Sequence, residues 1–242
     1  MFPTLMGTYG DGGNVAVLRD RALRRGIGVE VVTLGPDDAV PTHGDLYVVG
    51  GGEDHGQVAA ARRIRAHGAL SAAVDAGATV FAVCAGLQVI GESFEVEGGA
   101  VEPGAGILDV VTRRRHPRAV GEVLADPIAP LGVPRLTGYE NHGGGTLLGR
   151  DAAPLATVVA GIGNGAGGPG GDGTEGAVAG RILGTYLHGP VLARNPALAD
   201  QLLTWAVGCD LAPLDAPFVE ELRAEREAYL RLRLLGWGPR SS

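Results

Sequence analysis

A cysteine stands at the junction of a predicted strand and a predicted helix. The run Val80 to Cys84 is apolar and partly β-branched, as in a strand buried on both faces. Ala85 and Gly86 follow as small turn residues, and Leu87 to Ile90 fit the first turns of a helix. A thiol on such an elbow lies at the positive end of the helix dipole, which favours the nucleophilic thiolate. A buried structural cysteine is the alternative.

His188 has the sequence context that best suits a partner for this thiol. It follows a predicted strand from Val178 to Leu187 and precedes a glycine and a proline. An imidazole there could take the proton of Cys84 and later protonate a leaving amine. His142, inside the polar run Gly138 to Gly144, could be a base, a residue that fixes a tautomer, or a loop residue. We favour a structural or substrate-adjacent role for it.

Glycines and arginines supply candidate binding groups. Gly50, Gly51 and Gly52 directly follow a short predicted strand, so their N–H groups could converge on a developing oxyanion, with Ala85 N–H as a second donor. An ordinary loop is the alternative. The basic cluster from Arg113 to Arg118 is either an exposed turn or the source of an arginine that holds a carboxylate.

The glycine-rich turn before the first predicted helix does not match a dinucleotide fingerprint. In the run from Tyr9 to Asn14, the third glycine of Gly-x-Gly-x-x-Gly would fall at Val15. We therefore expect Asp11 or Asn14 to cap a helix that starts near Val15.

The order of predicted elements indicates an α/β fold. Strands at 29–34, 46–49 and 80–84 alternate with helices, which is typical of a mostly parallel central sheet flanked by helices. Short strands at 107–112 and 121–124 predict an antiparallel flank, and a helix is expected at 196–207. Active groups of such folds lie outside the carboxyl ends of the strands, where both the glycine triplet and Cys84 fall.

Composition excludes several classes of function. The net charge of −7 argues against a nucleic-acid partner. None of the 20 basic residues is lysine, which excludes a Walker-type phosphate loop and a Schiff-base lysine. Two cysteines, Cys84 and Cys209, give no disulfide framework, and we expect Cys209 to be inert packing. No run is long enough to span a membrane and no signal peptide is recognised, so we expect a soluble cytoplasmic protein.

Four ordered motifs resemble the triad-type (class I) glutamine amidotransferases of the cobyric-acid-synthase-like branch. Three of them are Val83-Cys84-Ala85-Gly86-Leu87-Gln88, the glycine triplet and Gly184 to Gly189. The fourth combines Tyr9 to Asn14 with Gly138 to Gly144, and it looks most like the glutaminase (GatD-type) subunits of lipid II isoglutaminyl synthases. The similarity spans roughly Leu5 to Leu203.

The resemblance implies a flavodoxin-like fold and hydrolysis of L-glutamine to L-glutamate and ammonia. It implies Cys84 as nucleophile, His188 as base, Arg118 for the glutamine carboxylate, and Gly51, Gly52 and Ala85 for the oxyanion. It also implies a heterodimer with a Mur-ligase-like (MurT-type) subunit that uses ATP and the ammonia to amidate the D-glutamate α-carboxyl of lipid II. No cofactor is expected in this chain, and ATP is expected on the partner.

The third catalytic group is left open by the sequence. Many amidotransferases have an acid two residues after the histidine, where this chain has Pro190. His188 could be oriented by a backbone carbonyl, by an acid from elsewhere in the chain, or by an acid of the partner subunit, which we favour at this point.

We expect an amidotransferase domain at 1–208 and a helical extension at 209–242 that packs on the same domain or on a partner. Within the extension, a charged helix is predicted at 217–235. Alternatives to the proposed acceptor are a corrinoid carboxylate, or no chemistry at all in a degenerate binding subunit. A stand-alone cysteine peptidase or hydrolase of similar topology is a third option.

Overall fold

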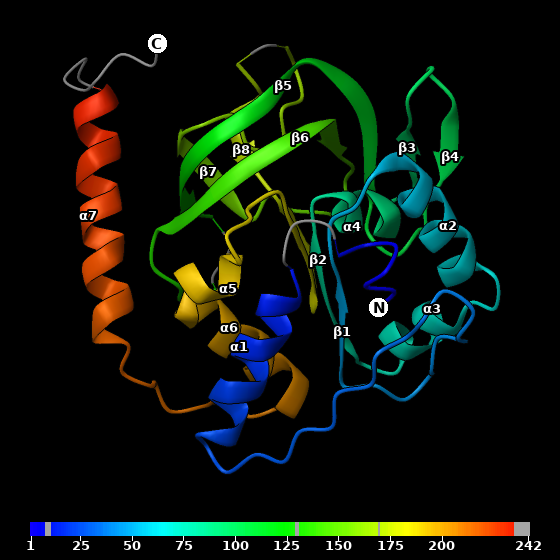
Figure 1. The fold of residues 1–242 in the computed structure, drawn as a ribbon, viewed down its shortest axis with the longest axis horizontal. Coiled ribbons are helices and arrows are strands. Elements are labelled where there is room, and N and C mark those ends of the chain that lie inside the picture. The colour runs from blue at the N-terminus through cyan, green and yellow to red at the C-terminus, as the bar shows by residue number, and fades with distance from the viewer. Residues whose placement is uncertain (8–10, 129–130, 169, 235–242) are drawn as a thin grey trace.

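A mostly parallel sheet lies at the centre of the molecule (Figure 1). The computed structural model describes residues 1–7, 11–128, 131–168 and 170–234. The sheet has the order β1 (Leu46–Val49), β2 (Thr79–Val83), β10 (Ile182–Thr185) and β9 (Ala177–Ala179). β1, β2 and β10 run parallel, whereas β9 is antiparallel to β10. All five residues of β2 are buried, as expected for a central strand with covered faces.

Helices cover both faces of this sheet (Figure 1). One group contains α1 (Gly12–Leu23), α5 (Val191–Arg194) and α6 (Pro196–Val207), and the other contains α2 (Asp54–Arg65) and α3 (Ala69–Asp75). The short helix α4 (Ala85–Ile90) follows β2 directly. The predicted α/β class, with a mostly parallel central sheet between helices, is therefore confirmed.

A second, mainly antiparallel sheet forms the flank. It contains β3 (Ser93–Glu95), β4 (Val101–Pro103), β5 (Val110–Pro127), β6 (Leu136–Leu148), β7 (Ala156–Ala160) and β8 (Thr174–Glu175). Residues 110–112 of the first predicted strand (107–112) and the whole of the second (121–124) are in fact parts of the single long strand β5, and residues 107–109 form no strand. β5 pairs with β6 along most of its length, and the register shifts between Arg114 and Ala119. The basic cluster is this irregularity within a strand, not a free turn, and its Arg115 is buried.

The strand predicted at 29–34 is wrong. No ladder in the described part of the chain includes these residues, and Val29, Val31 and Val32 are exposed. A β-branched sequence favours extended backbone, but a strand also needs a hydrogen-bonding neighbour. The only strand paired with β1 in the described sheet is β2.

The C-terminal helix α7 (Pro217–Leu234) lies beside the β5–β6 ribbon (Figure 1). Arg226 forms an ion pair with Glu122 of β5, and Arg223 donates to the carbonyl oxygen of Arg135. The extension thus contacts its own chain, although Phe218 on α7 is largely exposed. The predicted helix end at residue 235 lies outside the described residues. Cys209, expected to be packed, is exposed.

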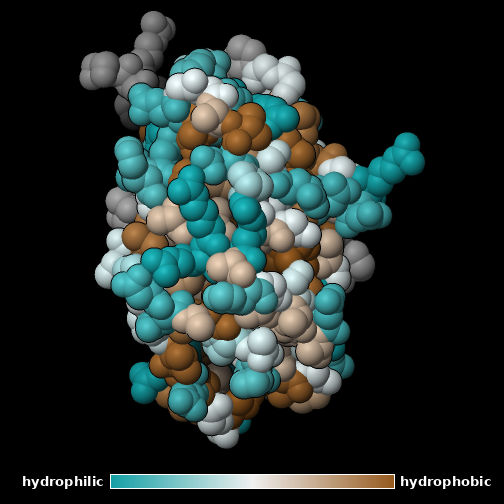
Figure 2. Space-filling view, turned by 90° about the vertical axis from the view of Figure 1, so that its right-hand side faces the viewer, coloured by the Kyte–Doolittle hydropathy of each residue, from teal (hydrophilic) through white to brown (hydrophobic). Residues whose placement is uncertain are grey.

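The surface carries no large apolar belt on the side seen in Figure 2, where hydrophilic and hydrophobic side chains are interspersed. Among the helices of the described residues, none combines the length and the apolar character that a membrane crossing requires.

Candidate active site

Cys84 lies on a strained turn between β2 and α4. Its backbone has φ 54° and ψ −111°, an unusual conformation for a residue with a side chain, and such strain is concentrated at functional sites. Its N–H donates to Thr185 O of β10 at 2.8 Å. The turn packs tightly on β1, because a Cβ atom added to Gly86 would lie 2.5 Å from Val49 O. This is the predicted elbow, with the thiol 5% exposed.

His188 lies just beyond β10, the strand that neighbours β2. Its backbone exchanges two hydrogen bonds with Tyr139 of β6, at 2.8 and 3.1 Å, which fixes the residue between the two sheets. Burial lowers the pKa of His188, but hydrogen bonds to Asp11 and Cys84, and their negative charge, outweigh it and raise the pKa to about 10. The structure therefore brings the two side chains predicted from sequence, Cys84 and His188, close enough to interact electrostatically.

Asp11 is a candidate functional residue that sequence reasoning missed. We expected a helix cap from Asp11 or Asn14, and neither side chain caps α1. Asp11 Oδ1 instead lies 3.4 Å from His188 Nδ1, and Asp11 Oδ2 accepts the N–H of Gly51 at 2.6 Å. The side-chain oxygen of Asn14 accepts the N–H of Leu192. An acid in a glycine-rich turn is typical of a helix cap, so the local sequence predicted that role for Asp11. Its contact with His188, 177 residues away, is visible only in the folded structure.

A pocket opens at Cys84. Four predicted catalytic and binding residues line it: Cys84, Gly52, Ala85 and Arg118. His142, whose role the sequence left open, lines it as well. Gly51 is placed differently, because its N–H is bound to Asp11. The N–H groups of Gly52 and Ala85 are therefore the candidate donors to an oxyanion, and Ala85, as the first residue of α4, has no acceptor within its own helix.

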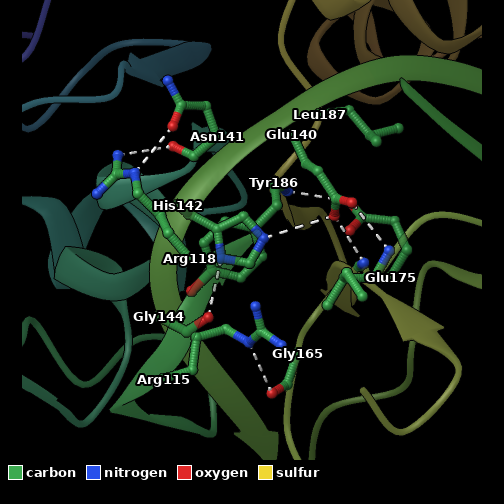
Figure 3. Close-up of polar contacts among 12 residues, drawn as sticks. Arg115, Arg118, Glu140, Asn141, His142, Gly144, Gly165, Glu175, Tyr186 and Leu187 are labelled. Carbon is green, nitrogen blue, oxygen red and sulfur yellow. Dashed lines mark hydrogen bonds and ion pairs between the residues drawn. The ribbon is translucent and has the colours of Figure 1, made fainter. Parts of the chain in front are cut away.

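Arg118 is held at the pocket by the neighbouring strand β6 (Figure 3). Its Nε donates to Asn141 Oδ1 at 2.9 Å and its Nη2 donates to Asn141 O at 3.1 Å. These bonds occupy one side of the guanidinium. The edge formed by Nη1 and the second Nη2 hydrogen keeps the fork geometry that suits a carboxylate.

A buried polar chain supports the floor of the pocket. Gln57 Nε2 donates to Gln88 Oε1 at 2.6 Å, and Gln88 Nε2 donates to Tyr186 Oη at 3.0 Å. The same hydroxyl lies 2.7 Å from Thr146 Oγ1. Burial raises the pKa of Tyr186, so its hydroxyl stays protonated. Each amide thus has a fixed orientation, which gives the pocket a rigid base.

His142 lines the pocket and also belongs to a second buried group, drawn in Figure 3. Its ring stacks on Tyr186 with centroids 3.8 Å apart, and its Nδ1 lies 2.8 Å from Gly144 O. A carbonyl only accepts, so Nδ1 carries a proton. Nε2 faces Glu140 Oε2 at 3.7 Å, and Glu140 accepts the N–H groups of residues 162 and 163. This arrangement supports the expected structural or substrate-adjacent role.

Glu175 lies next to Glu140 in the same buried group. It accepts hydrogen bonds from Thr185 Oγ1 at 2.5 Å and from Tyr186 N–H at 2.9 Å. Burial raises the pKa of Glu175 to about 7, and these hydrogen bonds oppose that rise only in part. The buried Glu175 carboxyl is therefore hydrogen-bonded to the segment that leads from β10 to His188, and it changes its protonation near pH 7.

The described residues contain no group of three or more His, Cys, Asp or Glu side chains that could hold a metal ion. The acids at the pocket, Glu53, Asp54 and Glu95, are accompanied by Arg114, whose Nη1 lies 3.3 Å from Asp54 Oδ2. The site combines a thiol beside an imidazole and a carboxylate with backbone N–H donors and an arginine at the pocket. Such a set of groups is suited to nucleophilic acyl transfer.

Sequence comparison identifies two groups of relatives. The chain is 32% identical over 223 residues to the lipid II isoglutaminyl synthase (glutamine-hydrolyzing) subunit GatD of Staphylococcus aureus, covering 90% of this chain and 88% of that protein. It is 32% identical over 211 residues to the corresponding subunit of Streptococcus pneumoniae, covering 86% and 78%. A cobyric acid synthase of Sphingopyxis alaskensis is 31% identical over 193 residues, covering 75% of this chain but 36% of that protein.

Structure comparison gives a matching fold. A crystal structure described as a glutamine amidotransferase superposes with a TM-score of 0.57 at 20% identity, covering 84% of this chain and 97% of that one. Residues 2–196 match the family model of the CobB/CobQ-like glutamine amidotransferase domain. The chain therefore belongs to the CobB/CobQ-like glutamine amidotransferase family.

Proposed function

We propose that the chain is the glutamine-hydrolysing subunit of a lipid II isoglutaminyl synthase. It releases ammonia from L-glutamine for a Mur-ligase-like partner that amidates the D-glutamate α-carboxyl of lipid II. The observation that carries the glutaminase is the position of Cys84, in the wall of a pocket that also holds Arg118, beside His188, whose pKa is raised by Asp11 and Cys84.

The first half of the reaction forms a thioester. The Cys84 thiolate attacks the side-chain amide carbon of glutamine, and the amide oxygen becomes an oxyanion near the N–H groups of Gly52 and Ala85. The imidazolium of His188 donates its proton to the amide nitrogen as the C–N bond breaks. Ammonia leaves and a γ-glutamyl thioester remains on Cys84. A raised pKa suits His188 to this step, because the ring holds the proton that the leaving amine needs.

The second half regenerates the enzyme. His188, now neutral, takes a proton from water as the water oxygen attacks the thioester carbon. The C–S bond breaks, the thiolate of Cys84 is restored and L-glutamate leaves. Arg118 binds the α-carboxylate in both halves, so it contributes to substrate binding in ground and transition states alike.

Relatives of nearly equal length support the choice of acceptor. The chain covers 88% of the GatD subunit of Staphylococcus aureus but about a third of a cobyric acid synthase. We therefore favour lipid II over a corrinoid carboxylate. ATP is used on the partner subunit, in keeping with the absence of lysine in this chain, and the reaction takes place in the cytoplasm.

The test uses the complex of this chain with its synthetase subunit. Cys84→Ala is expected to abolish glutamate release while amidation of lipid II with ammonium chloride and ATP continues, because that chemistry lies on the partner. Cys209→Ala is the matched control, since that thiol is exposed and away from the pocket. Glutamate release by the Cys84→Ala complex would refute the nucleophile. Amidation of a corrinoid, and not of lipid II, would refute the acceptor.

A further inference from the structure

Gly189, the residue directly after His188, lies under the side chain of an arginine. Its φ is 138°, in a region that residues with side chains rarely adopt. The guanidinium of Arg194 occupies the space where a side chain at 189 would lie: a Cβ atom added to Gly189 would be 2.5 Å from Arg194 Nε and 3.2 Å from Arg194 Cζ. Arg194 therefore packs directly on the residue next to the candidate base.

Glu122 of β5 holds this guanidinium. Arg194 Nη1 donates to Glu122 Oε2 at 2.6 Å, and Arg194 Nη2 donates to Glu122 Oε1 at 3.2 Å. The two side chains are 17% and 25% exposed, so the pair is mostly shielded from water. A pair made of two hydrogen bonds imposes a defined geometry on the guanidinium. The carboxylate thus fixes Arg194 in its place over Gly189.

The strand register places Glu122 close to the backbone of the base. Glu122 lies opposite Tyr139 in the β5–β6 ladder, and Tyr139 forms an isolated antiparallel bridge with His188. Three neighbouring segments therefore carry Glu122, Tyr139 and His188 side by side. The ion pair with Arg194 joins the outer of these segments to the chain that leaves His188.

The C-terminal helix α7 holds the same ion pair from outside the matched domain, which ends at residue 196. Arg226 donates to Glu122 Oε1 at 2.9 Å. Arg223 Nη1 lies 3.4 Å from Arg194 O and 3.2 Å from Asn195 Oδ1. α7 thus contacts both members of the pair, whereas the pocket is lined by residues from other parts of the chain.

We infer that Arg194 is a positioning residue for the proposed glutaminase: packed on Gly189 and held by Glu122 and α7, it fixes the backbone of His188 relative to Cys84. The inference rests on the proposed function. A displacement of about 1 Å at a reacting group can lower a rate about 100-fold. A purely structural Arg194 would support the fold without affecting the distance between base and thiol.

Arg194→Ala, assayed in the complex with the synthetase subunit, tests the positioning role. The substitution removes the side chain over Gly189 and leaves the residues that line the pocket unchanged. We expect kcat for glutamine to fall by about 10- to 100-fold. The KM should change little, because Arg118 and the rest of the pocket remain.

Glu122→Gln tests whether Arg194 acts through its carboxylate partner. We expect kcat to fall by about threefold to tenfold, because a neutral amide holds the guanidinium less firmly than a carboxylate does. Added to Arg194→Ala, the substitution should cost little more, since two residues in one ion pair are not additive. Full additivity of the two losses of kcat would overturn the inference.

Arg21→Ala is the matched control. Arg21 forms a pair of two hydrogen bonds with Asp200, shielded to a similar degree at 6% and 18% exposure, and this pair joins α1 to α6. Both arginine-to-alanine variants should lower the free energy of unfolding measured in urea, but only Arg194→Ala should lower kcat. Equal losses of kcat in the two variants, or no loss in either, would overturn the inference.

Alkylation of Cys84 tests the same point without glutamine. In a Cys209→Ala background, the rate of modification by iodoacetamide is measured against pH for Arg194→Ala, Arg21→Ala and the parent. Arg194→Ala is expected to slow alkylation at pH 7 by about threefold or more, because a displaced imidazolium stabilises the thiolate less. An unchanged alkylation profile in folded Arg194→Ala would overturn the inference.

Two remaining outcomes also decide. If the unsubstituted complex hydrolyses no glutamine, the proposed function fails, and the alkylation profiles still judge Arg194. If Arg194→Ala does not fold, Arg194→Lys takes its place, because lysine gives Glu122 a point charge without the planar group over Gly189. A kcat lowered by about threefold or more, together with slower alkylation, supports the inference, and an unchanged Arg194→Lys variant overturns it.

Discussion

Two buried histidines in this protein each face a buried carboxylate, and His188 also has the Cys84 thiol as a neighbour. His188 Nδ1 lies 3.4 Å from Asp11, and His142 Nε2 lies 3.7 Å from Glu140. Cys84 also helps to raise the pKa of His188, whereas the other nitrogen of His142 is bound to a backbone carbonyl and its ring stacks on Tyr186. A histidine next to an acid is therefore not by itself a catalytic base. The position of the nucleophile decides.

The two histidines differ in their surroundings because different sheets position them. His188 comes at the end of β10, which is paired with the strand that delivers Cys84, so parallel strand ends bring base and nucleophile together. His142 lies within the antiparallel ribbon and is enclosed by β6, Tyr186 and the loop held by Glu140. We expect the first group to move protons and the second to support β6, the strand that holds Arg118 through Asn141.

Replacing each of the two rings in turn tests whether only His188 acts as the base. We expect His188→Gln to lower kcat for glutamine by about 10³-fold or more, since a general acid and base is lost. His142→Gln should retain kcat within about tenfold, because its ring is bound to Gly144 O and stacked on Tyr186. It should lower the free energy of unfolding by about 1–3 kcal/mol through its lost buried hydrogen bond. Steady-state glutamate release and urea unfolding measure both. Equal losses of kcat in the two variants would contradict the division of roles.

Replacing Arg118, the arginine held by β6, tests the substrate side of the pocket. Arg118→Ala should raise the KM for glutamine roughly tenfold to a hundredfold, since a charged hydrogen-bonded contact is worth about 1.5–3 kcal/mol. The kcat should change little, because the contact is made in both ground and transition states. The control is Arg113→Ala, an exposed residue of the same cluster. Unaltered dependence on glutamine concentration would remove Arg118 from the binding site.

The smallest expected effect concerns stability and not chemistry. The folded-state pKa of Glu175 is raised from 4.5 to about 7, so the folded protein binds this proton more tightly than the unfolded chain. The favourable contribution is complete below pH 4.5 and is lost as the pH rises to about 7. Glu175→Gln should remove this loss, worth roughly 3 kcal/mol, from the free energy of unfolding. Urea unfolding at pH 5 and pH 8 measures it, and parallel pH profiles for variant and parent would refute it.

Local sequence signals predicted several elements with their bounds. β1 at Leu46–Val49 and α6 at Pro196–Val207 agree with the prediction, because a short apolar run and a proline-started amphipathic pattern need no distant partner. The elbow at Cys84 was likewise predicted from a buried strand followed by small residues. The segment at 29–34 failed for the opposite reason, since its strand character depends on a neighbour.

The α/β class, the candidate nucleophile on its turn and the histidine at a strand end could be predicted from the amino-acid sequence, because these depend on residues adjacent in the chain. The folded structure was needed to see that Asp11 faces His188, that Gly51 donates its N–H to Asp11 and that His142 is buried. Those contacts join residues far apart in sequence, and hydrogen bonds and burial energies between such residues leave no periodic or local pattern to read.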